Sequence, residues 1–73
     1  MEKVHSDVTG KDYYIKDVVR ILNLSQVCRY LSWNIELLDV YPSIDYKSGN
    51  PVLVFIFDRN TSKSAYDAWC KHQ

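Results

Sequence analysis

The clearest hydrophobic run in the chain is VLVFIF, at residues 52–57, which lies between Pro51 and the polar stretch DRNTS. Successive side chains of a β-strand point to opposite faces of its sheet, so this run would present one apolar set on each face. One face would carry Val52, Val54 and Ile56, and the other Leu53, Phe55 and Phe57. A strand with two apolar faces needs a cover on both of them, from the rest of the chain or from a partner.

Two further segments are predicted to be strands. Residues 35–41 read IELLDVY and end at Pro42, which cannot donate a ladder hydrogen bond and therefore favours a strand end, a bulge or a sheet edge. The following KSGN is typical of a turn, with Gly49 supplying a positive φ, so residues 35–41 and 52–57 are expected to form an antiparallel hairpin. Residues 13–21, YYIKDVVRI, are β-branched and aromatic and favour a strand, although their spacing also satisfies a helical period.

The first predicted helix covers residues 23–34, NLSQVCRYLSWN. Asn23 is its expected N-cap, and Gln26 stands at the position of the reciprocal partner in a capping box. Asn34 is a suitable stop, because Asn tolerates the left-handed conformation that ends many helices.

The second predicted helix covers residues 61–73. Thr61 or Ser62 is expected to cap its N-terminus. Lys71 and His72 suit its C-terminal end, where the helix dipole favours positive charge.

These elements predict an α+β fold with the order strand, helix, strand, strand, helix. Short connections keep neighbouring elements in contact, so both helices are expected on one face of a small antiparallel sheet built around the central hairpin. Residues 1–12 are polar and are expected to form a flexible N-terminal arm. Residues 13–73 would then form a single α+β domain.

Size and charge narrow the class of protein. A domain of 73 residues buries only about 60% of the surface that its unfolded chain exposes, so a partner surface would help it. Nine basic and nine acidic residues give no net charge, which disfavours duplex nucleic acid as a partner. The chain has no apolar run long enough for a membrane span or a signal peptide, so we expect it in the cytoplasm.

Little in the sequence indicates catalysis or metal binding. Cys28 and Cys70 are expected to be buried thiols on apolar helix faces. Cys70 and His72 are two residues apart, so a helix would place them on different faces and not as a catalytic pair. His5 would complete a Cys₂His₂ set, but the short paired spacings of a structural zinc site are missing. We therefore expect no enzyme, no metal and no cofactor.

Three short motifs carry a resemblance to a known family. They are N-x-x-Q-x-x-x-Y at Asn23, Gln26 and Tyr30, VFxFD at Val54, Phe55, Phe57 and Asp58, and an aromatic Trp69 near the chain end. In these motifs the chain resembles the domain of unknown function numbered 5659, found in short phage and prophage proteins of Gram-positive bacteria. The resemblance covers about two-thirds of the chain. It implies an origin in a phage or mobile element and a compact αββα-like core, and it brings no activity.

The leading functional hypothesis is protein binding through the second face of the 52–57 strand. If the helices cover Leu53, Phe55 and Phe57, the other face would stay open unless the first strand or the N-terminal arm folds across it. Residues 35–41 would extend this face with Leu38 and Val40 beside Glu36, or else with Ile35, Leu37 and Tyr41 beside Asp39. The candidate interaction residues are Val52, Val54, Ile56, Leu38 and Val40. A patch of this size favours a homodimer or a complex with a host protein.

The alternative hypothesis is single-stranded nucleic-acid binding. Six Tyr, two Trp and two Phe in so short a chain could include a stacking platform. The candidates are Tyr13, Tyr14, Tyr41 and Tyr46 for stacking, with Arg20, Arg29, Lys47 and Arg59 for the backbone. Of these, Tyr41, Tyr46, Lys47 and Arg59 are favoured. The neutral net charge weighs against this hypothesis.

Overall fold

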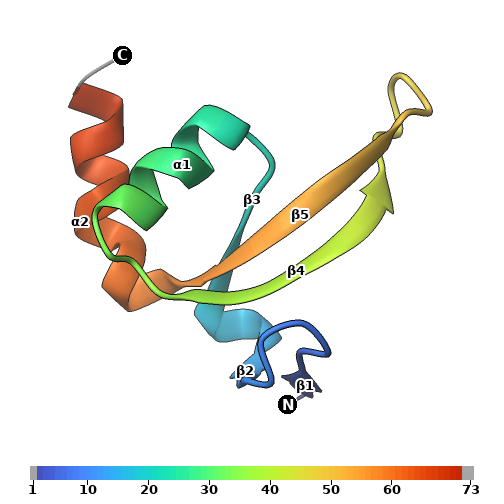
Figure 1. Cartoon of the computed structure of the whole chain (residues 1–73), viewed down its shortest axis with the longest axis horizontal. Helices are drawn as coiled ribbons and strands as arrows, with labels where there is room; N and C mark the ends of the chain where they lie inside the picture. The colour runs from blue at the N-terminus through green and yellow to red at the C-terminus, as the bar shows by residue number, and fades with distance from the viewer. Residues whose placement is uncertain (1, 72–73) are drawn as a thin grey trace.

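The structure, a computed structural model, describes residues 2–71. The strands are β1 (Lys3–His5), β2 (Asp12–Tyr14), β3 (Val18–Ile21), β4 (Leu37–Ile44) and β5 (Pro51–Asp58). The helices are α1 (Leu24–Ser32) and α2 (Arg59–Lys71), and the short 3₁₀ helix η1 (Ile15–Asp17) joins β2 to β3. This confirms the α+β class, with the two helices packed on a sheet and both on its upper side in Figure 1.

The main sheet has the strand order β3-β5-β4, and both of its pairings are antiparallel. β3 and β4 therefore run parallel to each other, are joined through α1, and have β5 between them. The VLVFIF run lies in β5, so it occupies the centre of the sheet and both of its faces can be covered. Pro42 lies in β4, where an edge strand tolerates its missing donor.

One face of β5 packs under the helices. The buried residues of this helix-side core are Val27, Tyr30, Phe57 and Ala65. The ring of Tyr30 meets that of Phe57 edge-on, with centroids 5.1 Å apart, and Tyr30 is the anchor that α1 places on the sheet. Phe55 and Trp69 pack around this cluster, so the expected contact between the helices and the aromatic face of the strand is confirmed.

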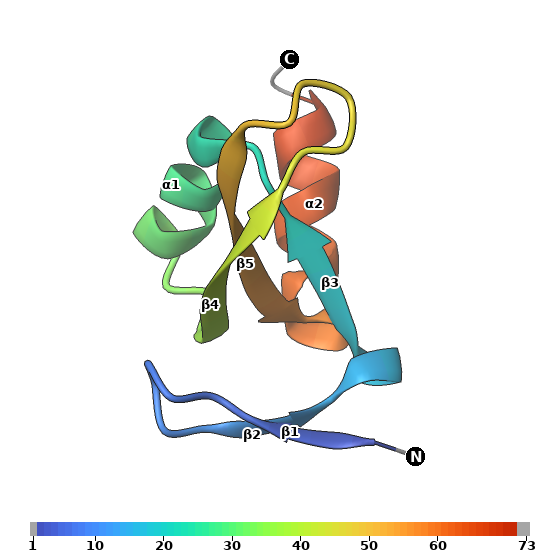
Figure 2. The same ribbon diagram turned by 90° about the vertical axis from the view of Figure 1, so that its right-hand side faces the viewer.

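The other face of β5 is covered by the N-terminal part of the chain. Val54 and Ile56 form a second buried cluster with Tyr13 and Val18, and Val4 packs against it. Figure 2 shows the β1–β2 hairpin crossing at the end of the sheet where β3 and β4 begin, and Figure 1 shows it on the side away from the helices. The two faces of VLVFIF are thus covered by different ends of the chain.

The N-terminal segment differs from the expected loose arm. Residues 3–5 pair with residues 12–14 as an antiparallel hairpin, which is a separate two-stranded sheet. The expected strand at residues 13–21 is divided into β2, η1 and β3. The 3₁₀ turn redirects the chain from the hairpin to the edge of the main sheet.

The residues predicted to begin and end α1 do so, although the capping box is incomplete. The Asn23 side chain accepts a hydrogen bond from the Gln26 amide, 3.2 Å, which confirms the cap. The Gln26 side chain does not return the bond, because its Nε2 donates to the Tyr30 hydroxyl instead. Asn34 has a φ of 62°, as the stop requires, and Gly49 has a φ of 74° in the β4–β5 turn.

The cap of α2 lies earlier than expected. The Asp58 carboxylate accepts a hydrogen bond from the Thr61 amide, so Asp58 caps the helix and neither Thr61 nor Ser62 does. Ser62 is buried and donates to the Asp58 carbonyl oxygen. His72 lies outside the described residues, and the expectation that it supports the helix end stays a prediction.

The cover on the second face of β5 has a measurable consequence. Replacing Ile56, which is 2% exposed, with Ala should lower the free energy of unfolding by about 2–5 kcal/mol, because it leaves a cavity under the hairpin. The control is Leu53→Ala, which removes a half-exposed side chain from the same strand and should cost less than half as much. Urea denaturation measures both values. Equal losses, or a small loss for Ile56→Ala, would show that this face is open.

Candidate interaction surfaces

The predicted interaction patch does not exist as an exposed surface. Val54 and Ile56 are fully buried, and Leu38 is half-buried against the same cluster. Val52 is also only half-exposed, opposite Ser43 of β4. The expectation that these residues are open for a partner is wrong for the central pair, because the N-terminal hairpin covers them.

Val40 lies on the other side of the sheet from the rest of the predicted patch. A β-bulge between Leu37 and Asp39 inserts Leu38 as an extra residue, which shifts the alternation along β4. Val40 therefore pairs with Phe55 on the helix side. The sequence offered either Leu38 with Val40 or Leu37 with Tyr41, and the bulge places Leu38 and Tyr41 together instead.

A buried carboxylate holds the N-terminal hairpin on the sheet. Asp39 is 6% exposed and accepts hydrogen bonds from the Ser6 hydroxyl at 2.6 Å and from the Tyr13 hydroxyl at 2.7 Å. The amide of Val40 donates to the same carboxylate at 2.8 Å. This buried site was not predicted from the sequence. An Asp inside the apolar strand IELLDVY was the available signal, since a buried carboxylate needs donors from elsewhere in the chain.

The hydrogen bonds fix the protonation states of this group, which we call the Asp39 lock (Asp39, Ser6 and Tyr13). Burial alone would raise the pKa of Asp39, but the bonds from Ser6, Tyr13 and the Val40 amide outweigh it and hold the pKa below its ordinary value. Burial and the bond to Asp39 raise the pKa of Tyr13 to about 12. Asp39 is thus the acceptor and Tyr13 the donor throughout the neutral range.

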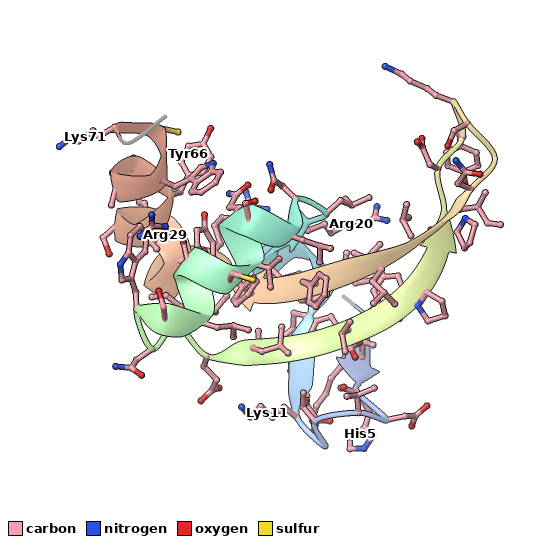
Figure 3. The ribbon with its side chains drawn as sticks, turned by 45° about the horizontal axis from the view of Figure 1, so that its top comes forward. His5, Lys11, Arg20, Arg29, Tyr66 and Lys71 are labelled. Carbon is pink, nitrogen blue, oxygen red and sulfur yellow. The ribbon has the colours of Figure 1, made fainter. Side chains whose placement is uncertain are left out.

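Further contacts join the hairpin to the first residues of β4. The Thr9 hydroxyl donates to the Leu38 carbonyl oxygen at 2.6 Å, and the Lys11 ammonium donates to that of Leu37 at 3.3 Å. Lys11 also forms an exposed ion pair with Glu36. Figure 3 shows Lys11 and His5 below β4, on the side away from the helices.

On the helix side, α1 exposes an apolar stripe. Leu24, Cys28 and Leu31 recur at spacings of four and three and so share one flank of the helix. Trp33, near the C-terminal end of α1, lines a small pocket with Ala65 and Ala68 of α2, and the helical period puts the stripe on the side of α1 away from Trp33 and hence away from α2. Leu53 lies on the same side of the sheet, beyond Phe55. We call this set the leucine surface: Leu24, Cys28, Leu31, Val40 and Leu53.

On the opposite face, a groove runs between the N-terminal hairpin and the sheet. Its volume is about 810 Å³, and its wall contains Tyr13, Tyr41 and Ile56. Arg20 of β3 and Arg59 of α2 line it as well. The structure therefore brings together Tyr41 and Arg59, two of the residues predicted for nucleic-acid binding.

A second, smaller groove of about 300 Å³ lies toward the β4–β5 turn. It is lined by Arg20, Val54 and Tyr46, so Arg20 belongs to both grooves. Tyr46 is 99% exposed, and Lys47 follows it in the turn. The four favoured candidates for nucleic-acid binding thus lie along these two grooves or in the turn at their end. Among the other candidates, Arg20 lines both grooves, whereas Tyr13 is buried against Asp39 and Arg29 lies on the helix side (Figure 3). Tyr14 lies exposed in β2.

The candidate metal and catalytic residues do not gather in the described part of the chain. Within residues 2–71, no group of three or more His, Cys, Asp or Glu side chains is placed to hold a metal ion. Cys28 and Cys70 are both exposed free thiols, which corrects the expectation of buried ones. Cys70 lies beside Tyr66 and raises the pKa of that hydroxyl through a hydrogen bond. His72, the fourth residue of the Cys₂His₂ set that the sequence offered, lies outside the described residues.

Comparison with known proteins gives no relative. No family model, no curated protein and no solved structure matches the chain. The resemblance to the short phage proteins therefore stays a prediction. None of the helices in residues 2–71 has the length and apolar character needed to cross a membrane.

The Asp39 lock predicts a loss of stability in acid. Because the folded state holds the pKa of Asp39 below its ordinary 3.8, the unfolded state binds the proton first as the pH falls. The carboxylate thus stabilises the fold fully above about pH 5, and its contribution declines as the pH falls through 3.8 and below. Asp39→Asn should cost about 1.5–3 kcal/mol at pH 7 and flatten the acid limb of the stability curve.

The matched control is Asp7→Asn, an exposed carboxylate of the same hairpin. Urea denaturation from pH 7 to pH 3 should give parallel curves for Asp7→Asn and the unaltered protein. If Asp39→Asn keeps the full acid dependence, Asp39 is not the group that holds the hairpin.

Proposed function

We propose that this protein acts non-catalytically by binding protein, first of all a second copy of itself, through the leucine surface. The observation that carries the proposal is the exposure of three leucines on one side of the molecule. Leu24, Leu31 and Leu53 are 63%, 45% and 50% exposed. Clustered large aliphatic side chains on so small a domain favour an interface, whereas single exposed ones need no explanation.

The shape of the surface suits a symmetric contact. A two-fold dimer uses the same patch on both copies, and a helix stripe can meet its own copy in an antiparallel crossing. Cys28 is the middle residue of the α1 stripe. In such a crossing the two Cys28 thiols would lie near the two-fold axis.

The energies indicate a weak dimer. Full burial of one Leu side chain is worth about 1.5–3 kcal/mol, so three half-exposed leucines would contribute roughly 2–4.5 kcal/mol from each copy. Two copies would contribute roughly 4.5–9 kcal/mol, against an association cost of at least about 4 kcal/mol. At the upper end the surplus is about 5 kcal/mol, which corresponds to a Kd of about 0.2 mM, so the dimer would form only at several hundred micromolar protein.

A different protein is the second candidate occupant of the same surface. The resemblance to short phage proteins suggests a bacterial host factor, bound stoichiometrically. Such a partner could supply a larger apolar anchor than the leucines of a second copy, and its complex would be tighter.

Self-association is tested by sedimentation equilibrium. The protein should show a monomer–dimer equilibrium, and Leu24→Glu and Leu31→Glu should each abolish it by burying an unpaired charge. The control is Leu22→Glu, because Leu22 is also half-exposed but lines the groove face. A short bismaleimide should trap the dimer in Cys70→Ser and not in Cys28→Ser. A protein that stays monomeric at several hundred micromolar contradicts self-association.

A further inference from the structure

The face of the sheet opposite the helices carries a continuous line of aromatic and cationic side chains. The first groove contains Tyr41, Arg59 and Arg20, and the second contains Arg20 and Tyr46. Arg20 joins the two grooves, and Lys47 stands beyond Tyr46 in the turn. This surface, which we call the tyrosine track (Arg59, Arg20, Tyr41, Tyr46 and Lys47), lies on the other face from the leucine surface.

The cations of the track are available to a ligand, whereas its acids are occupied. Neither Arg20 nor Arg59 forms an ion pair with any carboxylate of residues 2–71. Arg59 is oriented by a 3.2 Å hydrogen bond from its guanidinium to the Val18 carbonyl oxygen, which leaves its other donors free. Asp39 is occupied by the lock, and Asp45 accepts hydrogen bonds from the Lys47 amide and the Ser48 hydroxyl.

The two tyrosines are placed to stack on planar groups. Tyr46 is 99% exposed and so contributes nothing to the core. Tyr41 is half-buried and packs against the cluster under the hairpin while lining the first groove. Base–aromatic stacking needs unpaired bases, so a line of tyrosines and arginines suits a single strand and not a duplex.

The dimensions set the length of the ligand. Tyr41 lies in β4 opposite Val54, whereas Tyr46 lies in the β4–β5 turn. Arg59 follows the last residue of β5, at the other end of that strand. The eight residues of β5 span about 26 Å at 3.3 Å per residue, and at roughly 6 Å per nucleotide this corresponds to about four nucleotides, the lower end of known single-strand site sizes.

We propose that the tyrosine track binds a short single strand of nucleic acid, with Arg20 and Arg59 on its phosphates and Tyr41 and Tyr46 stacked on its bases. The proposal goes beyond the protein-binding function and uses a different surface. The neutral net charge of the whole chain does not oppose this binding, because Arg20 and Arg59 form no ion pair within residues 2–71 and can pair with phosphates.

Fluorescence anisotropy with labelled hexathymidylate and hexauridylate at 20 mM salt tests the track. Binding is expected in the micromolar range, and Arg20→Ala and Tyr41→Ala should each weaken it about tenfold, with Tyr46→Ala close behind. Neutralising two or three phosphates predicts a slope of log K against log salt of about −1.4 to −2.1. Preference between the two oligomers assigns the track to DNA or to RNA.

A matched control comes from the helix side, where Arg29 carries the same guanidinium away from Arg20 (Figure 3). Arg29→Ala should leave the affinity unchanged. Binding that is absent at 200 µM protein, or that falls equally in Arg29→Ala, overturns the proposal. Leu24→Glu should bind as the unaltered protein does, so the track and the leucine surface fail or succeed separately.

Discussion

The structure depends on one constraint, the need to cover both faces of β5. A strand with Val54 and Ile56 on one side and Phe57 on the other is stable only at the centre of a sheet with two layers over it. The helices supply one layer, and the hairpin of residues 3–14 supplies the other. The described residues form no third layer. A partner molecule would therefore contact outer surfaces of these layers, such as the outer side of α1 or the part of the sheet that the hairpin leaves uncovered.

The helix side of this arrangement could be predicted from the sequence because its signals are local. The cap at Asn23, the stop at Asn34 and the turn at Gly49 each follow from the conformational preference of one residue type. The aromatic face of VLVFIF follows the period of a strand, and the apolar side of α1 follows the period of a helix. In the fold these two faces pack against each other. The start of α2 was misplaced, since Asp58 belongs to the strand and to the cap at once. The capping box also failed, because the Gln26 side chain donates to Tyr30, and the two thiols are exposed and not buried.

The other side could not be predicted because its contacts are polar and distant in sequence. Ser6 meets Asp39 across 33 residues, and Tyr13 meets it across 26. No periodicity connects such positions, and a polar N-terminus resembles a free arm until its acceptor is known. The bulge at Leu38 added a second difficulty, because one extra residue reverses which side chains of β4 share a face. The predicted patch failed for these two reasons, and Val40 moved to the leucine surface.

The Asp39 lock also connects the cover of β5 with the groove beside it. Tyr13 and Asp39 both line the groove, so its wall exists only while the hairpin is docked. A ligand that contacts this wall would bind the docked state and not the undocked one, and would therefore stabilise the hairpin in proportion to its occupancy. The leucine surface has no such dependence, because α1 is held by Tyr30 on the opposite face. The groove of the tyrosine track therefore depends on whether the N-terminal hairpin is docked, whereas the leucine surface does not. The two surfaces lie on opposite faces of the main sheet.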